Sequence, residues 1–234
     1  MIKLLFLLPF LLFMSCSTKN TTSLGLETEN SQEIPDTIVD AKLLSLYFDA
    51  KNTSNATTLN SAIVLADSMI YTYKDNEKVH IKYVLQKILF LTLYNEIESA
   101  IDVIKGDSCS MWETIGGPYY KTILEHRILA MSAKNNNDQQ LYEANIKEAL
   151  KLVEKFISDN KDEYVLFLRN DLQHQRGKYL ISTQEYIYYT YLVYGIDRAN
   201  KILEEYQDLY HISDYVIEQL KRLYDMDIMD FYLL

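Results

Sequence analysis

This sequence contains few of the residues that break helices and form tight turns. Its 234 residues include only 6 glycines and 3 prolines. Sandwiches and barrels made of many short strands need frequent turns, and glycine and proline supply most of them. The scarcity of both residues therefore favours an all-α fold over a β-sandwich or a β-barrel.

Positive charge is also scarce. The chain has 23 lysines and arginines against 33 aspartates and glutamates, which gives a formal net charge of -10. A nucleic-acid-binding domain normally carries a basic patch, so we expect no nucleic-acid partner. Anionic lipid headgroups repel such an acidic surface, so any contact with a membrane has to come from another feature.

The sequence signatures of catalysis are missing. None of the 4 histidines lies in the His-Glu-x-x-His spacing that places two zinc ligands and a general base on one helix face. There is no Gly-x-Ser-x-Gly elbow and no phosphate-binding glycine loop. Asp171 and His174, with Arg176 nearby, could be a fragment of an acid–base or metal site, but a solvated pair on a helix surface is the favoured interpretation. We predict a non-enzymatic protein with no metal and no cofactor.

Long apolar runs are absent after the first residues of the chain. Residues 4–14 form one apolar stretch, preceded by Lys3 and followed by Ser15 and Cys16. The stretch is short for a membrane-spanning helix, which needs ~20 apolar residues. A positive start, an apolar centre and a small residue before a processing site are typical of a secretory signal peptide.

The segment Phe13-Met14-Ser15-Cys16 resembles the lipobox of bacterial lipoproteins. The resemblance implies that residues 1–15 are a signal peptide and that Cys16 is acylated and becomes the new N-terminus. Acyl chains anchor a protein because each buried methylene contributes ~0.8 kcal/mol, and more than one chain gives stable attachment. Ser17 follows the cysteine, which by similarity to enteric lipoproteins implies the outer membrane, facing the periplasm. An ordinary secreted protein is the alternative.

Acylation of Cys16 would leave Cys109 as the only remaining cysteine, without an intramolecular disulfide partner. Cys109 lies in the longest irregular segment, residues 106–118, and no motif pairs it with a histidine. We interpret Cys109 as a small, half-buried hydrophobic residue.

The remaining chain divides into a tether and one helical domain. Residues 16–36 are rich in serine, threonine, asparagine and glutamate without periodicity, which predicts a flexible tether with a reach of roughly 25 Å. Residues 37–234 form the predicted domain, because apolar residues recur there at three- and four-residue spacings. Residues 185–195 would suit a strand as well as a helix, and we assign a helix because the neighbouring segments are helical.

Polar breaks and capping residues give the predicted helix boundaries. Breaks are expected near residues 52–58, 74–78, 94–96, 135–138 and 158–161, with 165–179 continuing as one helix. Gly106 is the predicted C′ residue of a helix, and Gly116-Gly117-Pro118 is the predicted turn. The predicted N-terminal caps are Thr57 or Thr58, Asp138, Ser182 in a capping box with Glu185, Asp197 and Ser213. Residues 226–234 form an apolar tail that we expect to fold back onto the last helix.

The sequence LTLYNEIESAI, residues 91–101, resembles the turn and second helix of a tetratricopeptide repeat, with Ala100 in the small position where two helices pack closely. Ala149 and Ala199 are the equivalent candidates, at spacings of 49 and 50 residues rather than the family's period of about 34. The resemblance implies antiparallel helix pairs stacked as a short TPR-like α-solenoid over about residues 57–225. An irregular helical bundle is the alternative.

Stacked helix pairs form a continuous surface on which other proteins bind. The leading interpretation is therefore a non-enzymatic, lipid-anchored envelope protein whose helical repeats bind a protein partner. The alternatives are an immunity lipoprotein that neutralises a periplasm-targeted toxin and a carbohydrate-binding accessory lipoprotein. The candidate partner or ligand surface comprises Trp112, Tyr119, Tyr120, Tyr188 and Tyr191. Packing in the core is the competing interpretation of these aromatic residues.

Overall fold

The computed structural model describes residues 36–53, 55–169, 177–226 and 228. The predicted signal peptide, Cys16 and nearly all of the predicted tether lie outside the described residues, as does the Asp171–His174 pair.

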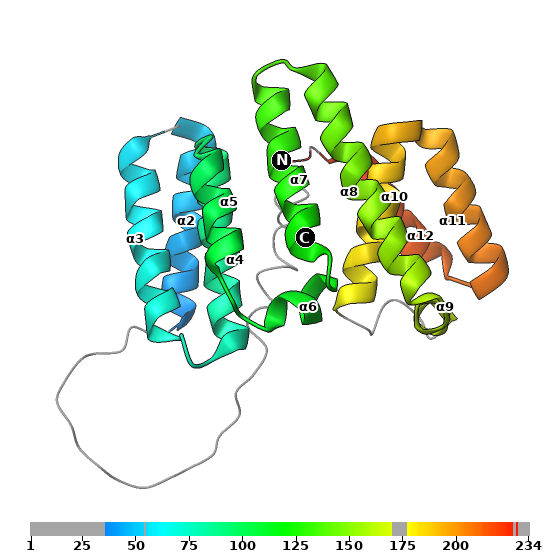
Figure 1. Cartoon of the computed structure of the whole chain (residues 1–234), viewed down its shortest axis with the longest axis horizontal. Helices are drawn as coiled ribbons and strands as arrows, with labels where there is room; N and C mark the ends of the chain where they lie inside the picture. Colours follow the sequence, from blue (N-terminus) through cyan, green and yellow to red (C-terminus); the bar gives the residue numbers. More distant parts are fainter. Residues whose placement is uncertain (1–35, 54, 170–176, 227, 229–234) are drawn as a thin grey trace, which may run out of the picture.

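All regular elements in the described part of the chain are helical, which confirms the all-α prediction (Figure 1). They are α2 (Asp36–Thr53), α3 (Ala56–Thr72), α4 (Glu77–Leu93), α5 (Ile97–Gly106), α6 (Met111–Gly116), α7 (Tyr120–Asn135), α8 (Gln139–Asp159), α9 (Lys161–Arg169), α10 (Lys178–Tyr194), α11 (Ile196–Tyr210), α12 (Asp214–Lys221) and the 3₁₀-helix η2 (Arg222–Asp225). Among these helices none has the length and apolar character that crossing a membrane would require.

Consecutive helices pack as pairs along the chain: α2 with α3, α4 with α5, α7 with α8, and α10 with α11. The first helices of the first three pairs begin at residues 36, 77 and 120, so the pairs start 41 and 43 residues apart. This period differs from the 49 and 50 residues expected from the three alanines. Ala100 and Ala199 are both the fourth residue of their helices and fully buried, whereas Ala149 is buried in the middle of α8. Ala149 is therefore not equivalent to the other two.

Two turns between paired helices have the same construction. Asn95 and Asn137 adopt the left-handed conformation, with φ of 61° and 57°. The N–H of the following residue, Glu96 or Asp138, donates to a carbonyl five residues back. This is the arrangement of a Schellman motif, and asparagine tolerates the left-handed backbone better than most residues. The two asparagines are 42 residues apart, so the turns follow the period of the helix pairs.

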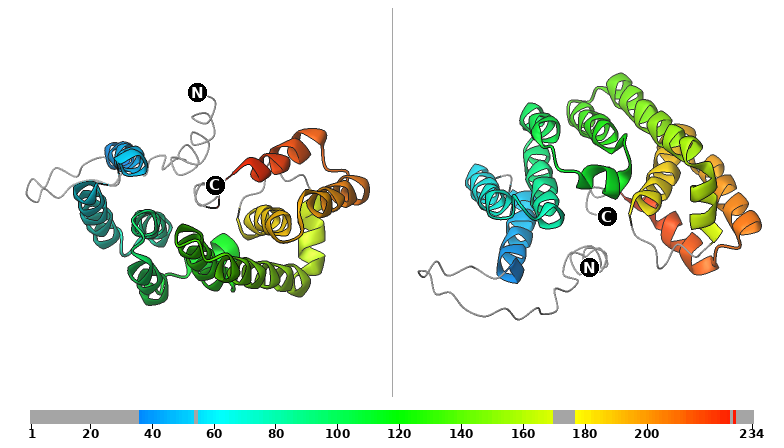
Figure 2. Two further views of the ribbon diagram at one scale, coloured as in Figure 1. Left: turned by 90° about the horizontal axis from the view of Figure 1, so that it is seen from above. Right: turned by 60° about the horizontal axis from the view of Figure 1, so that its bottom comes forward.

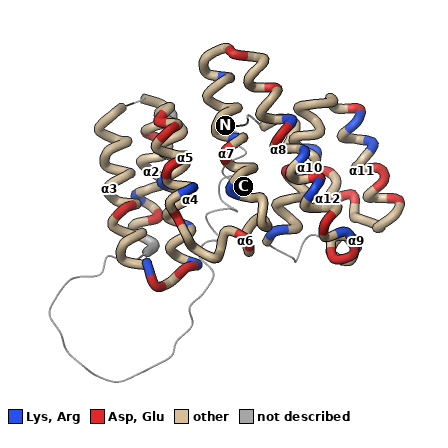
Figure 3. The backbone as a smooth tube through the Cα atoms, in the orientation of Figure 1, with Lys and Arg blue, Asp and Glu red and all other residues tan. Residues whose placement is uncertain are grey.

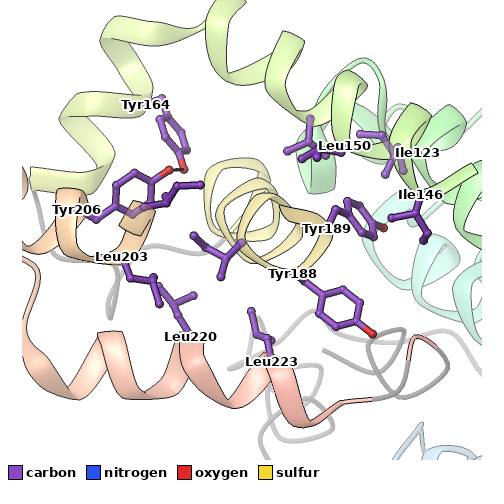
Figure 4. Close-up of a cluster of buried hydrophobic side chains, with 14 of the residues drawn as sticks. Ile123, Ile146, Leu150, Tyr164, Tyr188, Tyr189, Leu203, Tyr206, Leu220 and Leu223 are labelled. Carbon is purple, nitrogen blue, oxygen red and sulfur yellow. Dashed lines mark hydrogen bonds between the residues drawn. The ribbon is translucent and has the colours of Figure 1, made fainter. Parts of the chain in front are cut away.

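Helix α10 lies at the centre of the C-terminal part of the molecule (Figure 4). Ile187, Tyr188 and Tyr189 are consecutive and all completely buried, so neighbours surround the helix on several sides. A helix buried all round has no polar face, which explains why residues 185–195 show no helical periodicity. The assignment of these residues to a helix is confirmed.

The start of α10 corrects two predictions. The helix begins at Lys178, so Ser182 and Glu185 are buried residues inside it rather than the two members of a capping box. Gly177 has φ of 112°, which no helix contains, so residues 165–179 are not one continuous helix.

Among the predicted N-terminal caps, Asp138 is confirmed, because its carboxylate accepts a hydrogen bond from the Leu141 N–H at 3.0 Å. Asn55, not Thr57 or Thr58, caps α3. Gly106 is the last residue of α5 and not a left-handed C′ residue.

At the C-terminal end of the chain, Gly195 rather than Asp197 precedes α11. Ser213 occupies the N-cap position of α12 but makes no capping bond with its side chain. Little of the predicted apolar tail is described, although Ile228 is buried in the same core cluster as α10.

Seen from above, the helices follow an arc from α2 and α3 at one end to α11 and α12 at the other (Figure 2, left). The last helix pair ends the array with a charged surface (Figure 3). Lys201, Glu204, Glu205 and Asp208 are exposed on α11, while Ile202, Leu203 and Tyr206 face the core.

Candidate functional site

The connection between α5 and α7 is the candidate site. We expected residues 106–118 to be irregular, but they contain the six-residue helix α6. This helix packs against α4, α7 and α10, so it lies where the N-terminal and C-terminal parts of the array meet. The predicted turn at residues 116–118 is confirmed by Gly117, whose φ is 82°.

Asp107 holds the connection in place through its carboxylate. Its Oδ2 lies 2.6 Å from Nε2 of His80, and its Oδ1 accepts hydrogen bonds from the Trp112 indole at 2.8 Å and from the Cys109 N–H at 3.0 Å. Burial alone would raise the pKa of Asp107, but these bonds outweigh it, so the pKa lies below its usual value. Asp107 is therefore a fixed negative charge at neutral pH.

His80 connects this network to α3. Its Nδ1 lies 3.3 Å from the carbonyl oxygen of Ile70, while its Nε2 faces Asp107. Both ring nitrogens therefore lie beside oxygen atoms that accept hydrogen bonds. His80 and Asp107 are 27 residues apart, a separation that matches no motif, so sequence analysis missed them.

A hollow of about 390 Å³ opens beside this network. It is lined by Ser108, Cys109, Ser110, Trp112, Glu113, Gly117, Pro118 and Lys121. The Lys121 ammonium donates to the carbonyl oxygen of Asp107 and lies 5.2 Å from the centre of the Trp112 ring. The hollow therefore combines a positive charge, hydroxyl groups and an aromatic wall.

Cys109 is half-buried, as predicted. Burial raises the pKa of its thiol, and the carboxylates of Glu77 and Asp107 act in the same direction. A thiol with a raised pKa carries less thiolate at neutral pH, so Cys109 is a weak nucleophile.

The aromatic residues predicted to form a partner surface lie mostly in the core. Trp112 is only 3% exposed and packs near Tyr120, which is also buried, with 6.1 Å between ring centres. Both side chains are therefore largely covered by their neighbours, although Trp112 also lines the hollow. Tyr119 is partly exposed, and its hydroxyl donates to Asp159 at 2.8 Å and accepts from Lys155 at 2.6 Å.

Tyr188 and Tyr191 share one side of α10, but the C-terminal segment covers that side. The Tyr188 hydroxyl donates to the carbonyl oxygen of Met226 at 3.1 Å, and the Tyr191 ring lies 4.8 Å from the Tyr224 ring. Tyr188 is completely buried, so it cannot be part of an open ligand surface. The carbohydrate-binding hypothesis thereby loses the residue pair that motivated it.

A second buried polar group joins α7 to α10. Nε of Arg127 donates to the Tyr189 hydroxyl at 2.6 Å, and another guanidinium nitrogen donates to Oε1 of Glu185. Oε2 of Glu185 is buried without a hydrogen-bond partner. Burial raises the pKa of Glu185 to about 7, although Arg127 acts in the opposite direction. Arg127, Glu185 and Tyr189 do not line the hollow, so we interpret this buried polar group as structural.

No set of three or more histidine, cysteine, aspartate or glutamate side chains within the described ranges is arranged to hold a metal ion. Comparison of the chain with protein-family models, curated proteins and solved structures finds no match. The functional argument therefore depends on the geometry of this chain alone.

Proposed function

We propose that this protein is a lipid-anchored protein of the bacterial envelope, without enzymatic activity, whose helical array binds a protein partner. Cys16 is the proposed lipidation site, and the outer membrane facing the periplasm is the proposed location. The arrangement of helix pairs in an open arc supports the proposal, because such arrays offer a long surface to another chain.

The observation that carries the proposal is a pair of exposed large side chains, Val64 and Tyr71, on the outward side of α3, with the polar residues Asp67 and Ser68 between them. Val64 is 69% exposed and Tyr71 is 76% exposed. They are seven residues apart, which is close to two helical turns, so both point to the same side of the helix. Tyrosine and large apolar side chains on one exposed face are typical of protein contact surfaces. We assign the partner-binding surface to this side of α3.

The test uses the full-length protein, tagged at its C-terminus and expressed in its native cell. Membranes are isolated and cross-linked, and proteins that co-purify are quantified by mass spectrometry. The contact surface is changed in the double variant Val64→Glu and Tyr71→Glu. The matched control is Leu209→Glu on α11, at the other end of the arc, where the side chain is 63% exposed. Circular dichroism checks that each variant is folded.

We expect one stoichiometric partner with the wild-type protein and with the control, and its loss from the double variant. Retention of the partner by the double variant would show that α3 is the wrong surface. Absence of any partner from the wild-type sample would contradict the proposed function. If the partner is a toxin, the immunity hypothesis replaces the general one.

A further inference from the structure

We infer that the hollow beside α6 is a binding site for a small organic carboxylate, with Lys121 as the group that binds its negative charge. The inference goes beyond protein binding and rests on residues that the α3 surface does not include.

The size and lining of the hollow suit a small ligand with an apolar body. A volume of about 390 Å³ lies within the range of about 300–1,000 Å³ that is usual for small-molecule sites. Trp112 and Pro118 supply apolar surface, and Ser108 supplies a hydroxyl group, whereas the Ser110 hydroxyl already donates to the carboxylate of Glu77. A compact molecule with one polar end matches this mixture.

The positive charge of Lys121 indicates that the ligand carries a negative charge. Its ammonium contacts the Asp107 carbonyl oxygen and the face of Trp112, and neither is a carboxylate. The Asp107 carboxylate is occupied by His80, the Cys109 N–H and the indole of Trp112. In the described part of the chain, Lys121 therefore has a positive charge that no ion pair neutralises.

Lys121 is also held in place before a ligand arrives. One of its N–H groups is used by the carbonyl oxygen, and the indole holds the ammonium through a cation–π contact. An ammonium has three donors, so two remain for a carboxylate. Because the side chain is already ordered, binding loses little of its rotational freedom.

Glu113 is the opposing charge in the lining of the hollow. It is exposed on α6, and its carboxylate repels a bound anion. The site therefore makes two predictions of opposite sign. Removal of the charge at Lys121 weakens carboxylate binding, and removal of the charge at Glu113 strengthens it.

Trp112 provides the measurement, because it is the only tryptophan in the chain and lines the hollow. Full-length protein in detergent is titrated with benzoate, and with benzamide as an uncharged molecule of the same shape. Saturable change of the Trp112 fluorescence counts as binding, and a linear decrease without saturation counts as collisional quenching. The variants are Lys121→Met and Glu113→Gln, with Lys105→Met on α5 as a charge-matched control outside the hollow.

We expect saturable binding of benzoate, at least tenfold weaker binding of benzamide, a tenfold or greater loss in Lys121→Met and a severalfold gain in Glu113→Gln. Lys105→Met should bind like the wild type. The inference is overturned if benzoate does not saturate, if benzamide binds equally well, or if Lys105→Met loses as much affinity as Lys121→Met. The α3 variants should bind benzoate normally, so failure of this site and failure of the proposed protein contact are distinguishable.

Discussion

Arg127 and Glu185 illustrate how strongly a buried charge depends on its partner. Glu185 is 0% exposed, and within the described residues its charged partner is Arg127. We expect Arg127→Met alone to lower the free energy of unfolding by about 3–5 kcal/mol, because it leaves Glu185 buried without a counter-charge. The double variant Arg127→Met with Glu185→Leu should regain most of this loss, since apolar side chains of similar volume replace buried ion pairs well. Urea unfolding followed by circular dichroism measures both, and additive losses would contradict the argument.

The lowered pKa of Asp107 predicts how the stability of the folded protein depends on pH. Its pKa is lower in the folded protein than in the unfolded chain, so its stabilising effect is present above the unfolded pKa and is lost as the pH falls through the folded pKa. Asp107→Asn should therefore lower the free energy of unfolding by about 2 kcal/mol at pH 7. The difference in the free energy of unfolding between Asp107→Asn and the wild type should become smaller as the pH falls below about 4. Thermal unfolding monitored by Trp112 fluorescence measures this.

The control for acid dependence is Asp102→Asn, which removes a carboxylate from an exposed position on α5. It should leave the stability at pH 7 nearly unchanged. A constant difference between Asp107→Asn and the wild type at all pH values would show that the loss comes from packing and not from the charge of Asp107.

Among the helices and turns, the close packing of the α6–α7 turn depends on Gly117. A Cβ atom there would lie 2.5 Å from Cε2 of Phe156, and the backbone has φ of 82°. Gly117→Ala should therefore lower the free energy of unfolding by about 2 kcal/mol or more. Gly106→Ala is the control, because this glycine is helical and nothing lies within 4 Å of the added Cβ. It should be neutral or stabilising by up to about 1 kcal/mol in urea unfolding.

Periodicity predicted the helices that have one polar face, and it was less informative elsewhere. Between the predicted breaks at 135–138 and 158–161, periodicity indicated a helix because α8 keeps charged residues on one side and buries Ile146, Leu150 and Val153 on the other. Helix α6 is too short to show a period, so it was missed. Helix α10 is buried on several sides, and its start was placed after Ser182, although the helix begins at Lys178.

The polar networks of the candidate site could not be predicted for a different reason. His80 and Asp107 are 27 residues apart, and Arg127 and Glu185 are 58 apart. Each pair meets only because helices from different pairs pack together, and no local spacing records such a contact. Trp112 was identified as a candidate from its rarity, but only the packing shows that its indole lies in the core and lines a hollow.

On the scale of the whole molecule, the described core begins at Val39 in α2 and is formed by the helices of the array. The proposed lipidation site, Cys16, precedes these helices in the sequence. We expect Cys16→Ser to move the protein from the membrane fraction to the soluble fraction without changing its melting temperature. Acyl chains are the proposed source of membrane affinity, because the net charge of -10 opposes binding to anionic lipid.

Cell fractionation and labelling with radioactive palmitate measure this effect. Cys109→Ser is the matched control, because it removes the other cysteine of the chain from a partly buried position in the helical body. The control should stay in the membrane fraction and keep its label, whereas Cys16→Ser should lose both. Membrane association of unlabelled Cys16→Ser would contradict lipid anchoring and would assign the attachment to a protein partner of the helical array instead.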